Sequence, residues 1–296
     1  MLAFFKFASQ LVGTSLLPLL LVTQVCSQNA ASGVPALIQA NSQSEIVALL
    51  GSKSAHDAVK RYQKLAESGS PEAQNNLAVL YLYGDNRESH AAVELLQAAA
   101  QKGFAPAEFN LGILYESGFV LKQDSSLAVE WLWKAAQAHY SLAEGELGVI
   151  FLEARGVARD YDRARHWFEL AAQDGLASAA NNLGVMYAQG SGSQPDAEAA
   201  YHWYLRAANT GSDIAQNNLG VALFQGQGVQ ADPALGLRFM KQAADKGNAD
   251  AQYNFRAACH SALVPDPVCA ERMVSTNEYF RKPGARVLWR TDYLER

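Results

Sequence analysis

The residues best suited to chemistry in this sequence are two histidines on a regular spacing. His166 and His202 are 36 residues apart, and Glu130 and Arg238 hold the same register on either side. Two imidazoles beside a carboxylate are a starting set for a zinc site. No third histidine or cysteine shares this register, and equivalent residues on stacked helices start about 10 Å apart. We therefore interpret the four residues as a partly exposed polar stripe and predict no metal site.

Short motifs of the common catalytic sites are missing from the sequence. It contains no Ser-x-x-Lys, Gly-x-Ser-x-Gly, His-Glu-x-x-His, P-loop or Gly-x-Gly-x-x-Gly pattern. Catalysis requires a nucleophile, a base or a metal ion that the fold brings together. We predict that the chain is not an enzyme, with no catalytic residues and no cofactor.

Composition and net charge exclude some classes of binding partner. Of the 296 residues, 49% are hydrophobic, and the net charge is −5. Such a chain can bury a substantial core and is not intrinsically disordered. Nucleic-acid binding draws on clustered lysine and arginine, which this sequence lacks. We predict no nucleic-acid partner.

The N-terminal residues form a separate segment related to export. Lys6 precedes an apolar run over residues 11–22, which is shorter than the roughly 20 residues that span a bilayer. This pattern is typical of a secretory signal peptide. We predict a signal peptide over residues 1–27, cleaved near Ser27, and a periplasmic or secreted chain. The alternative is an uncleaved segment or a lipid on Cys26, which would be the chain's only membrane contact.

Removal of that segment leaves two cysteines, Cys259 and Cys269. In an oxidising compartment a nearby pair favours a disulfide over a metal site, and no Cys-x-x-Cys motif is present. The bond would tie the last periodic helix to an atypical segment. We predict that residues 259–296 form a C-terminal cap or tail.

The elements that position these residues belong to a repeated motif. Each copy opens with an alanine, followed by a leucine or phenylalanine after four residues and, in all but the last, by an aromatic residue or leucine after eight, which places them on one helical face. Four copies also carry a glycine directly after the leucine, at a cost of about 1 kcal/mol relative to alanine in a helix. We infer that a neighbouring helix approaches closely there. The opening alanines, 34 residues apart at first and 36 thereafter, are Ala73, Ala107, Ala143, Ala179, Ala215 and Ala251.

A second helix follows in each copy, after a glycine-containing turn. An aspartate stands at the expected N-cap, bulky residues and paired alanines form an apolar stripe, and a glycine closes the helix in most copies. His139 replaces that glycine once. We predict that Trp131, Trp167 and Trp203 belong to the core. The predicted N-caps are Asp124, Asp160, Asp196 and Asp232.

The repeat "A-x-x-N-L-G-x-x-Y", a glycine turn and "D-x-x-x-A-x-x-W-[FY]-x-x-A-A-x-x-G" resembles the Sel-one-like repeats, relatives of the tetratricopeptide repeat. The resemblance covers residues 54 to about 258. It implies an all-α fold, a right-handed α/α superhelical solenoid of about five to six 36-residue repeats. The resemblance also implies a protein-binding function. Residues 28–53, rich in serine, glutamine and alanine over most of their length, are predicted to form a linker with a short helix.

The resemblance places the first helix of each copy on the concave face of the solenoid. Residues two before and two after the leucine would point to that face and bind a peptide or protein, with amides for hydrogen bonds and aliphatic groups for desolvation. The pattern leaves open whether the second set lies between neighbouring helices instead. The candidate partner-binding residues are Asn75, Val79, Phe109, Ile113, Val149, Asn181, Val185, Asn217, Val221 and Tyr253.

Together these features predict a non-catalytic protein-interaction scaffold of the cell envelope. A cysteine-rich branch of the resembling family is linked to penicillin binding, but its mark is a cysteine pair in each repeat. This chain has one such pair, at its end. The alternative function is a secreted or periplasmic enzyme that acts on peptidoglycan or β-lactams.

Overall fold

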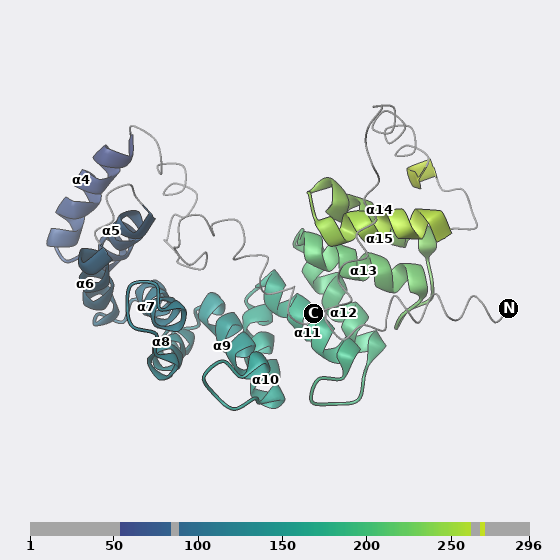
Figure 1. Ribbon diagram of the computed structural model, residues 1–296, viewed down its shortest axis with the longest axis horizontal. Helices are drawn as coiled ribbons and strands as arrows, with labels where there is room; N and C mark the ends of the chain where they lie inside the picture. Colours follow the sequence, from purple (N-terminus) through teal and green to yellow (C-terminus); the bar gives the residue numbers. More distant parts are fainter. Residues whose placement is uncertain (1–53, 84–88, 262–266, 270–296) are drawn as a thin grey trace, which may run out of the picture. The chain divides into compact units, whose positions relative to one another are not determined.

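The computed structural model describes residues 54–83, 89–261 and 267–269, and every regular element in these ranges is a helix (Figure 1). The predicted signal peptide, the linker over 28–53 and most of the predicted cap lie outside the described residues. Among the helices that are described, none has the length and apolarity to cross a membrane.

The helices alternate between the two types that the repeat predicts. The A helices, each of which contains the opening alanine of its copy, are α5 (Pro71–Tyr83), α7 (Ala105–Ser117), α9 (Ser141–Glu153), α11 (Ala177–Gln189), α13 (Asp213–Gln225) and α15 (Ala249–Ser261). The B helices are α4 (Ser54–Glu67), α6 (Ser89–Ala100), α8 (Ser125–Gln137), α10 (Tyr161–Gln173), α12 (Ala197–Asn209) and α14 (Pro233–Asp245). The all-helical fold class is confirmed.

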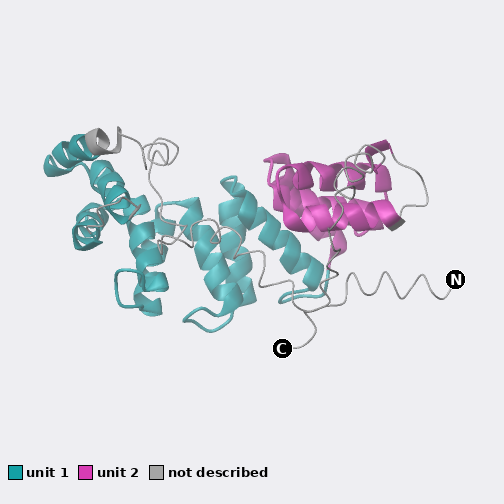
Figure 2. Cartoon of the chain, turned by 45° about the horizontal axis from the view of Figure 1, so that its top comes forward, with its two compact units in different colours: residues 1–195 teal, residues 196–296 magenta. Residues whose placement is uncertain are grey.

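Two compact units divide the chain, residues 1–195 and 196–296 (Figure 2). In the first unit, each helix from α4 to α11 packs against the next along the chain. In the second unit, α12 to α15 do the same, and α13 also contacts α15. Packing of each helix against its sequence neighbours is the organisation of a solenoid.

The predicted aspartates cap the B helices. Asp124 accepts hydrogen bonds from the backbone N–H groups of Ser126 and Leu127, both at 3.0 Å. The other three aspartates each accept one such bond. At the opposite end, His139 adopts a φ of +55°, in the left-handed region where the equivalent residue of α10 is Gly175. The histidine therefore takes over a backbone conformation that normally favours glycine.

Replacing Asp124 with alanine should lower the free energy of unfolding by about 1 kcal/mol, because two N–H groups at the start of α8 lose their acceptor. Urea denaturation followed by circular dichroism measures this change. Asp124→Asn is the matched control, since its side-chain oxygen can still accept both bonds. An equal loss in the two variants would show that charge, and not the cap, matters at this position.

The glycines of the A helices make room for the B helix of the same copy. A Cβ atom on Gly148 would lie 2.5 Å from Cδ1 of Phe168, and one on Gly220 would lie 2.8 Å from the carbonyl oxygen of Gly236. These separations are shorter than real carbon contacts. The inference that a neighbouring helix approaches at the glycine is confirmed in these copies.

The tryptophans lie nearer the surface than predicted. Each is half-buried, whereas the residue directly after it is buried: Leu132, Phe168 and Tyr204 follow Trp131, Trp167 and Trp203. Lys134 places its Nζ atom 4.0 Å from the ring centroid of Trp131, a cation–π contact at the surface. Trp131 and Trp167 still pack against the main hydrophobic cluster, so these tryptophans lie at the edge of the core while the residue after each of them is buried within it.

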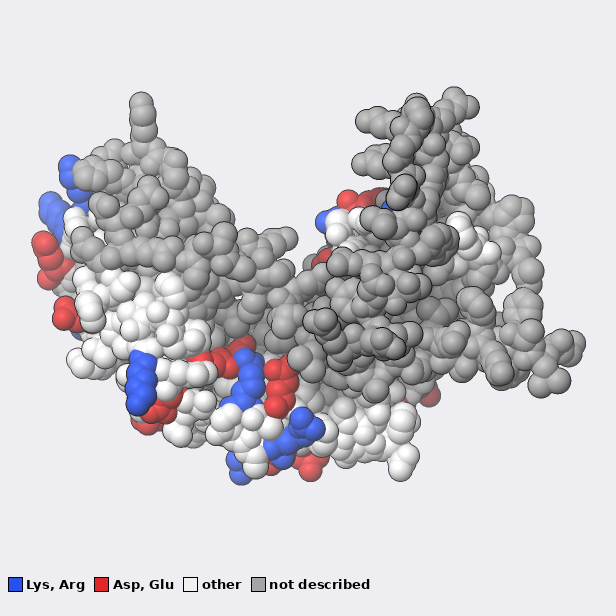
Figure 3. All heavy atoms as spheres, viewed as in Figure 1, with Lys and Arg blue, Asp and Glu red and all other residues white. Residues whose placement is uncertain are grey.

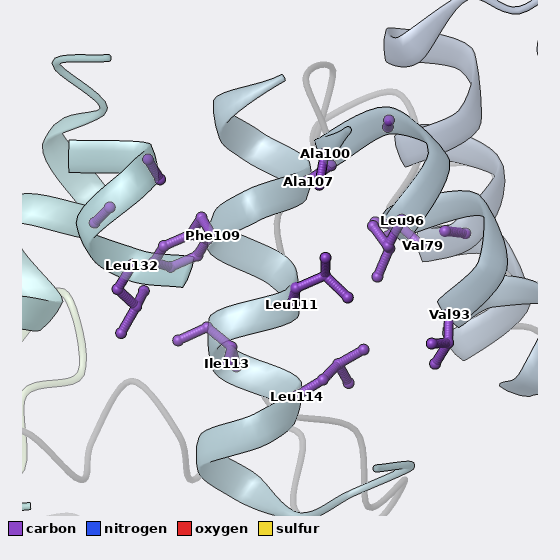
Figure 4. Packing of buried hydrophobic residues seen from close by; sticks show 14 of the residues in the cluster. Val79, Val93, Leu96, Ala100, Ala107, Phe109, Leu111, Ile113, Leu114 and Leu132 are labelled. Carbon is purple, nitrogen blue, oxygen red and sulfur yellow. The ribbon is translucent and has the colours of Figure 1, made fainter. Parts of the chain in front are cut away.

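The core of the first unit runs along both sides of its A helices. Figure 4 shows Leu111 and Leu114 of α7 directed towards Leu96 of α6, while Phe109 and Ile113 point to the other side, towards Leu132 of α8. An A helix in this unit is thus covered on more than one face. Residues that a single amphipathic stripe would leave exposed are buried here.

Candidate protein-binding face of the A helices

The aliphatic set proposed for binding is largely core. Val79, Ile113 and Val149 are all buried, and the first two belong to the main hydrophobic cluster. Val185 and Val221 are half-buried. Of the two arrangements that the sequence left open, burial between helices is the one found for the first three copies. These three side chains do not form an open strip for a partner.

The set before the leucine also differs from the expected open face. Asn75, Phe109, Asn181 and Asn217 are buried, and only Tyr253, in the last copy, is exposed. The amides hold neighbouring A helices together instead of facing solvent. Asn110 Nδ2 donates to Asn75 Oδ1 at 2.8 Å, and Asn254 Nδ2 donates to Asn217 Oδ1 at 3.0 Å.

These bonds identify a second amide position, one residue after the first, which the repeat motif contains but which was not among the candidate binding residues. Its members are Asn76, Asn110, Asn182, Asn218 and Asn254, with Glu146 in the third copy. The recurrence at the repeat spacing was the available signal. We call the two positions together the amide ladder. A buried amide requires hydrogen-bond partners, and the neighbouring ladder positions provide some of them.

On α15, the side chains at the two amide-ladder positions are partly or largely exposed to solvent. Tyr253 is 65% exposed, the largest exposed fraction among the large apolar side chains that the structure describes outside its gaps. Asn254 beside it and Val221 on α13 are half-buried. The phenol ring, the amide and the valine come from two helices that contact each other. This group, Val221, Tyr253 and Asn254, is here termed the α15 patch.

An acidic cluster joins α7 to α9 around Arg155. Its guanidinium contacts Glu116 through Nη1, Glu146 through Nη2 at 2.5 Å and Glu153 through Nε at 3.2 Å. Glu116 and Glu146 are largely buried. This grouping of carboxylates is not visible in the sequence, because Glu116 and Glu146 meet only when α7 and α9 are brought together.

The pKa of the Glu116 carboxyl is raised to about 7, mainly by burial and then by the Glu146 charge, with Arg155 opposing the shift. Glu153 in the same cluster also has a raised pKa, mainly through burial. A carboxyl group of this kind can exchange a proton near neutral pH. Arg155, however, forms ion pairs with these carboxylates, so the cluster is a network of ion pairs.

The two histidines on the repeat spacing are both exposed. In the described ranges, no three ligand-type side chains are grouped in a way that could hold a metal ion. The predicted cysteine pair is joined: Cys259 and Cys269 form a disulfide with a Cα–Cα distance of 5.6 Å.

Charges of both signs lie side by side on the face seen in Figure 3 wherever described residues are visible. Arg163 and Arg165, for example, pair with Asp160 and Asp162 on the surface of α10. A partner that binds this face would be recognised mainly through its shape and its hydrogen-bonding groups, because charges of opposite sign here largely offset one another.

Comparison with solved structures identifies other repeat proteins of the same fold. A Sel1 repeat protein from Oxalobacter formigenes is 26% identical with a TM-score of 0.64, covering 75% of this chain and 99% of its own. The protein c5321, a protective antigen present in uropathogenic Escherichia coli strains that displays an SLR fold, is 25% identical with a TM-score of 0.58. This match covers 75% of the present chain and 56% of c5321.

The search of curated proteins gave no match. The Sel1 repeat family model, in contrast, matches five consecutive segments: residues 71–104, 105–140, 141–176, 177–212 and 213–248. Each segment begins at or next to the start of an A helix and includes the following B helix. The matched segments cover more than half of the sequence, and the chain therefore belongs to the Sel1 repeat family.

Proposed function

We propose that this chain is a non-catalytic scaffold of the cell envelope that binds a segment of a partner protein at the α15 patch. Sel1 repeat proteins are generally protein-interaction scaffolds. The observation that carries the proposal is the exposed Tyr253 next to the hydrogen-bonded pair of Asn217 and Asn254. Exposed tyrosines beside polar groups recur at the centres of protein interfaces.

The α15 patch provides both parts of such a contact. The ring of Tyr253 and the side chain of Val221 offer apolar area, and the amide of Asn254 offers hydrogen bonds to a partner backbone. The envelope location is supported by the signal-like N-terminal sequence and by the disulfide, which requires an oxidising compartment. Buried candidates such as Val79 and Asn75 are assigned to packing within the repeat array instead of to partner binding.

Tyr253→Ala should weaken partner binding at least tenfold, as loss of a hot-spot tyrosine does, at roughly 2 kcal/mol or more. The thermal midpoint should stay unchanged because the side chain is mostly exposed. The measurement is photo-crosslinking in intact cells with the probe at position 253, followed by affinity titration with the captured partner.

Trp133→Ala is the matched control, since Trp133 is also an exposed aromatic residue, 51% accessible, but lies on a B helix. Adducts from probes at both positions, or equal loss of affinity in both variants, would contradict a specific α15 patch. Hydrolysis of peptidoglycan or a β-lactam by the purified chain would contradict the non-catalytic assignment. The Glu116–Glu146 pair is the first place to test in that case.

A further inference from the structure

Glutamines at one position of the A helices connect each helix to the B helix before it. Gln74 Nε2 donates to the carbonyl oxygen of Ala66 at 3.4 Å, and Gln252 Nε2 donates to that of Ala244 at 3.3 Å. Both acceptors lie eight residues earlier, in the last turn of a B helix. Each of these carbonyl groups also accepts from the N–H of the glycine that follows the B helix, so the side-chain amide adds a second hydrogen bond at the helix end.

At this same position, α7 and α9 carry Glu108 and Glu144. Glu144 is 1% exposed, and its Oε2 atom has no hydrogen-bond partner in the structure. By the eight-residue offset, the carbonyl group equivalent to that of Ala66 belongs to Ala136. An ionised carboxylate can only accept hydrogen bonds, whereas a protonated one donates as the glutamine amide does.

The amide ladder is replaced in the same helix. Where five other A helices have asparagine, α9 has Glu146, which shares Arg155 with Glu116. Three carboxyl groups and one guanidinium leave an excess of negative charge in a largely buried place. Buried charge without a partner is costly. Binding one proton removes the excess repulsion between Glu116 and Glu146 and lets one carboxyl donate to the other.

We propose that α9 is a pH-sensitive joint of the repeat array, whose buried carboxyl groups complete the hydrogen bonds to its neighbours only when they are protonated. The joint is tight in mild acid and opens more readily at pH 8. The other A helices have uncharged residues at these positions, apart from Glu108 of α7, so their packing is much less sensitive to pH.

The charged and titratable groups around α9 support looser packing at higher pH. Around Glu144 they are His139 after α8, with Nδ1 3.9 Å from Oε1, and His166 and Asp174 from α10 and its end. Around Glu116 they are Glu146, Glu153 and Arg155. Glu108 faces Lys134 of α8. Helix α11, which also contacts α9, has no ionisable side chain except Tyr187.

The sign of the effect follows from the pKa directions. Burial, and then Asp174, raises the pKa of Glu144, while His139 and His166 lower it. The pKa of Glu116 is raised from 4.5 to about 7. A carboxyl group with a raised folded-state pKa contributes its stability below pH 4.5 and loses it as the pH rises through about 7. The window for the switch is therefore pH 4.5 to about 7.

Hydrogen exchange of the full mature chain at pH 5 and pH 8, corrected for the intrinsic exchange rate, tests the joint. The opening equilibrium of α9 amides should increase at least tenfold between the two values, since a change of one pKa unit is tenfold. Amides of α13, which has Gln216 and Asn218 at the two positions, are the internal reference and should change little.

The double variant Glu116→Gln/Glu144→Gln keeps the shapes of both side chains and should hold α9 equally protected at both pH values. Glu94→Gln, an exposed residue of α6, is the matched control and should retain the wild-type response. Conversely, Gln252→Glu should make exchange in α15 sensitive to pH. Equal protection of wild-type α9 at pH 5 and 8, or an unchanged response in the double variant, would overturn the proposal.

Discussion

Replacing Phe168 with alanine is expected to lower the free energy of unfolding by about 3–5 kcal/mol, the largest effect of any single change considered for this chain. The ring is fully buried, and its atoms lie against Gly148 of the facing A helix. Alanine would leave a cavity between α9 and α10 that the helices cannot close without shifting their own neighbours. Urea denaturation followed by circular dichroism gives the free energy.

A change on the opposite side of this contact provides the control. Gly148→Ala should cost about 1–3 kcal/mol, because the added methyl group collides with the rigid ring. Gly145→Ala, on the same helix, meets only Cδ2 of Leu176, the end of a flexible side chain, and should be neutral or stabilising by up to about 1 kcal/mol. If both glycine variants behave alike, the contact between Gly148 and Phe168 does not control the packing of the repeat.

Loss of the disulfide should destabilise the C-terminal end of the array by about 3 kcal/mol, the value expected for a loop closed over this separation. Cys259 and Cys269 are 10 residues apart. The bond ties α15 to residues 267–269, of which Val268 and Cys269 pack into a cluster with Phe255. Differential scanning calorimetry of Cys259→Ser/Cys269→Ser, compared with wild type, measures the loss.

The wild-type protein with and without dithiothreitol provides a second comparison. Cys26 falls in the predicted signal peptide, so a chain expressed from residue 28 contains no other cysteine on which the reductant could act. Reduction should therefore reproduce the serine variant. A midpoint that does not change on reduction would mean that the C-terminal segment is held by packing alone.

Much of the fold could be predicted because the repeat signal is local. The aspartate caps, the glycine in the A helix and the leucine before it follow from contacts between residues that are close in sequence. The tryptophans show the limit of this reasoning. Trp167 and Phe168 are consecutive and both lie near the apolar stripe, so periodicity alone cannot decide which of them points at Gly148.

The site was harder to predict because burial between copies is a tertiary property. Ile113 lies on the side of α7 that a lone amphipathic helix would expose, and only the neighbouring helices cover it. Glu116, Glu146 and Arg155 come from two copies and meet only after stacking. One available signal was Glu146 itself, an acid in a register that otherwise holds asparagine.

The glycine contacts have a consequence for how such a gene can change in length. Each glycine and the bulky residue that it faces are separated by the same number of positions, as in 112 and 132, 148 and 168, and 220 and 240. Both partners thus lie within one copy, and an in-frame duplication of 36 residues inherits a complete, matched contact. The acids around Arg155 span two copies, so an in-frame deletion of 36 residues with a breakpoint between Glu116 and Glu146 would remove a member of the cluster. These two copies are therefore expected to be kept or lost together during evolution, whereas single copies elsewhere can be lost one at a time.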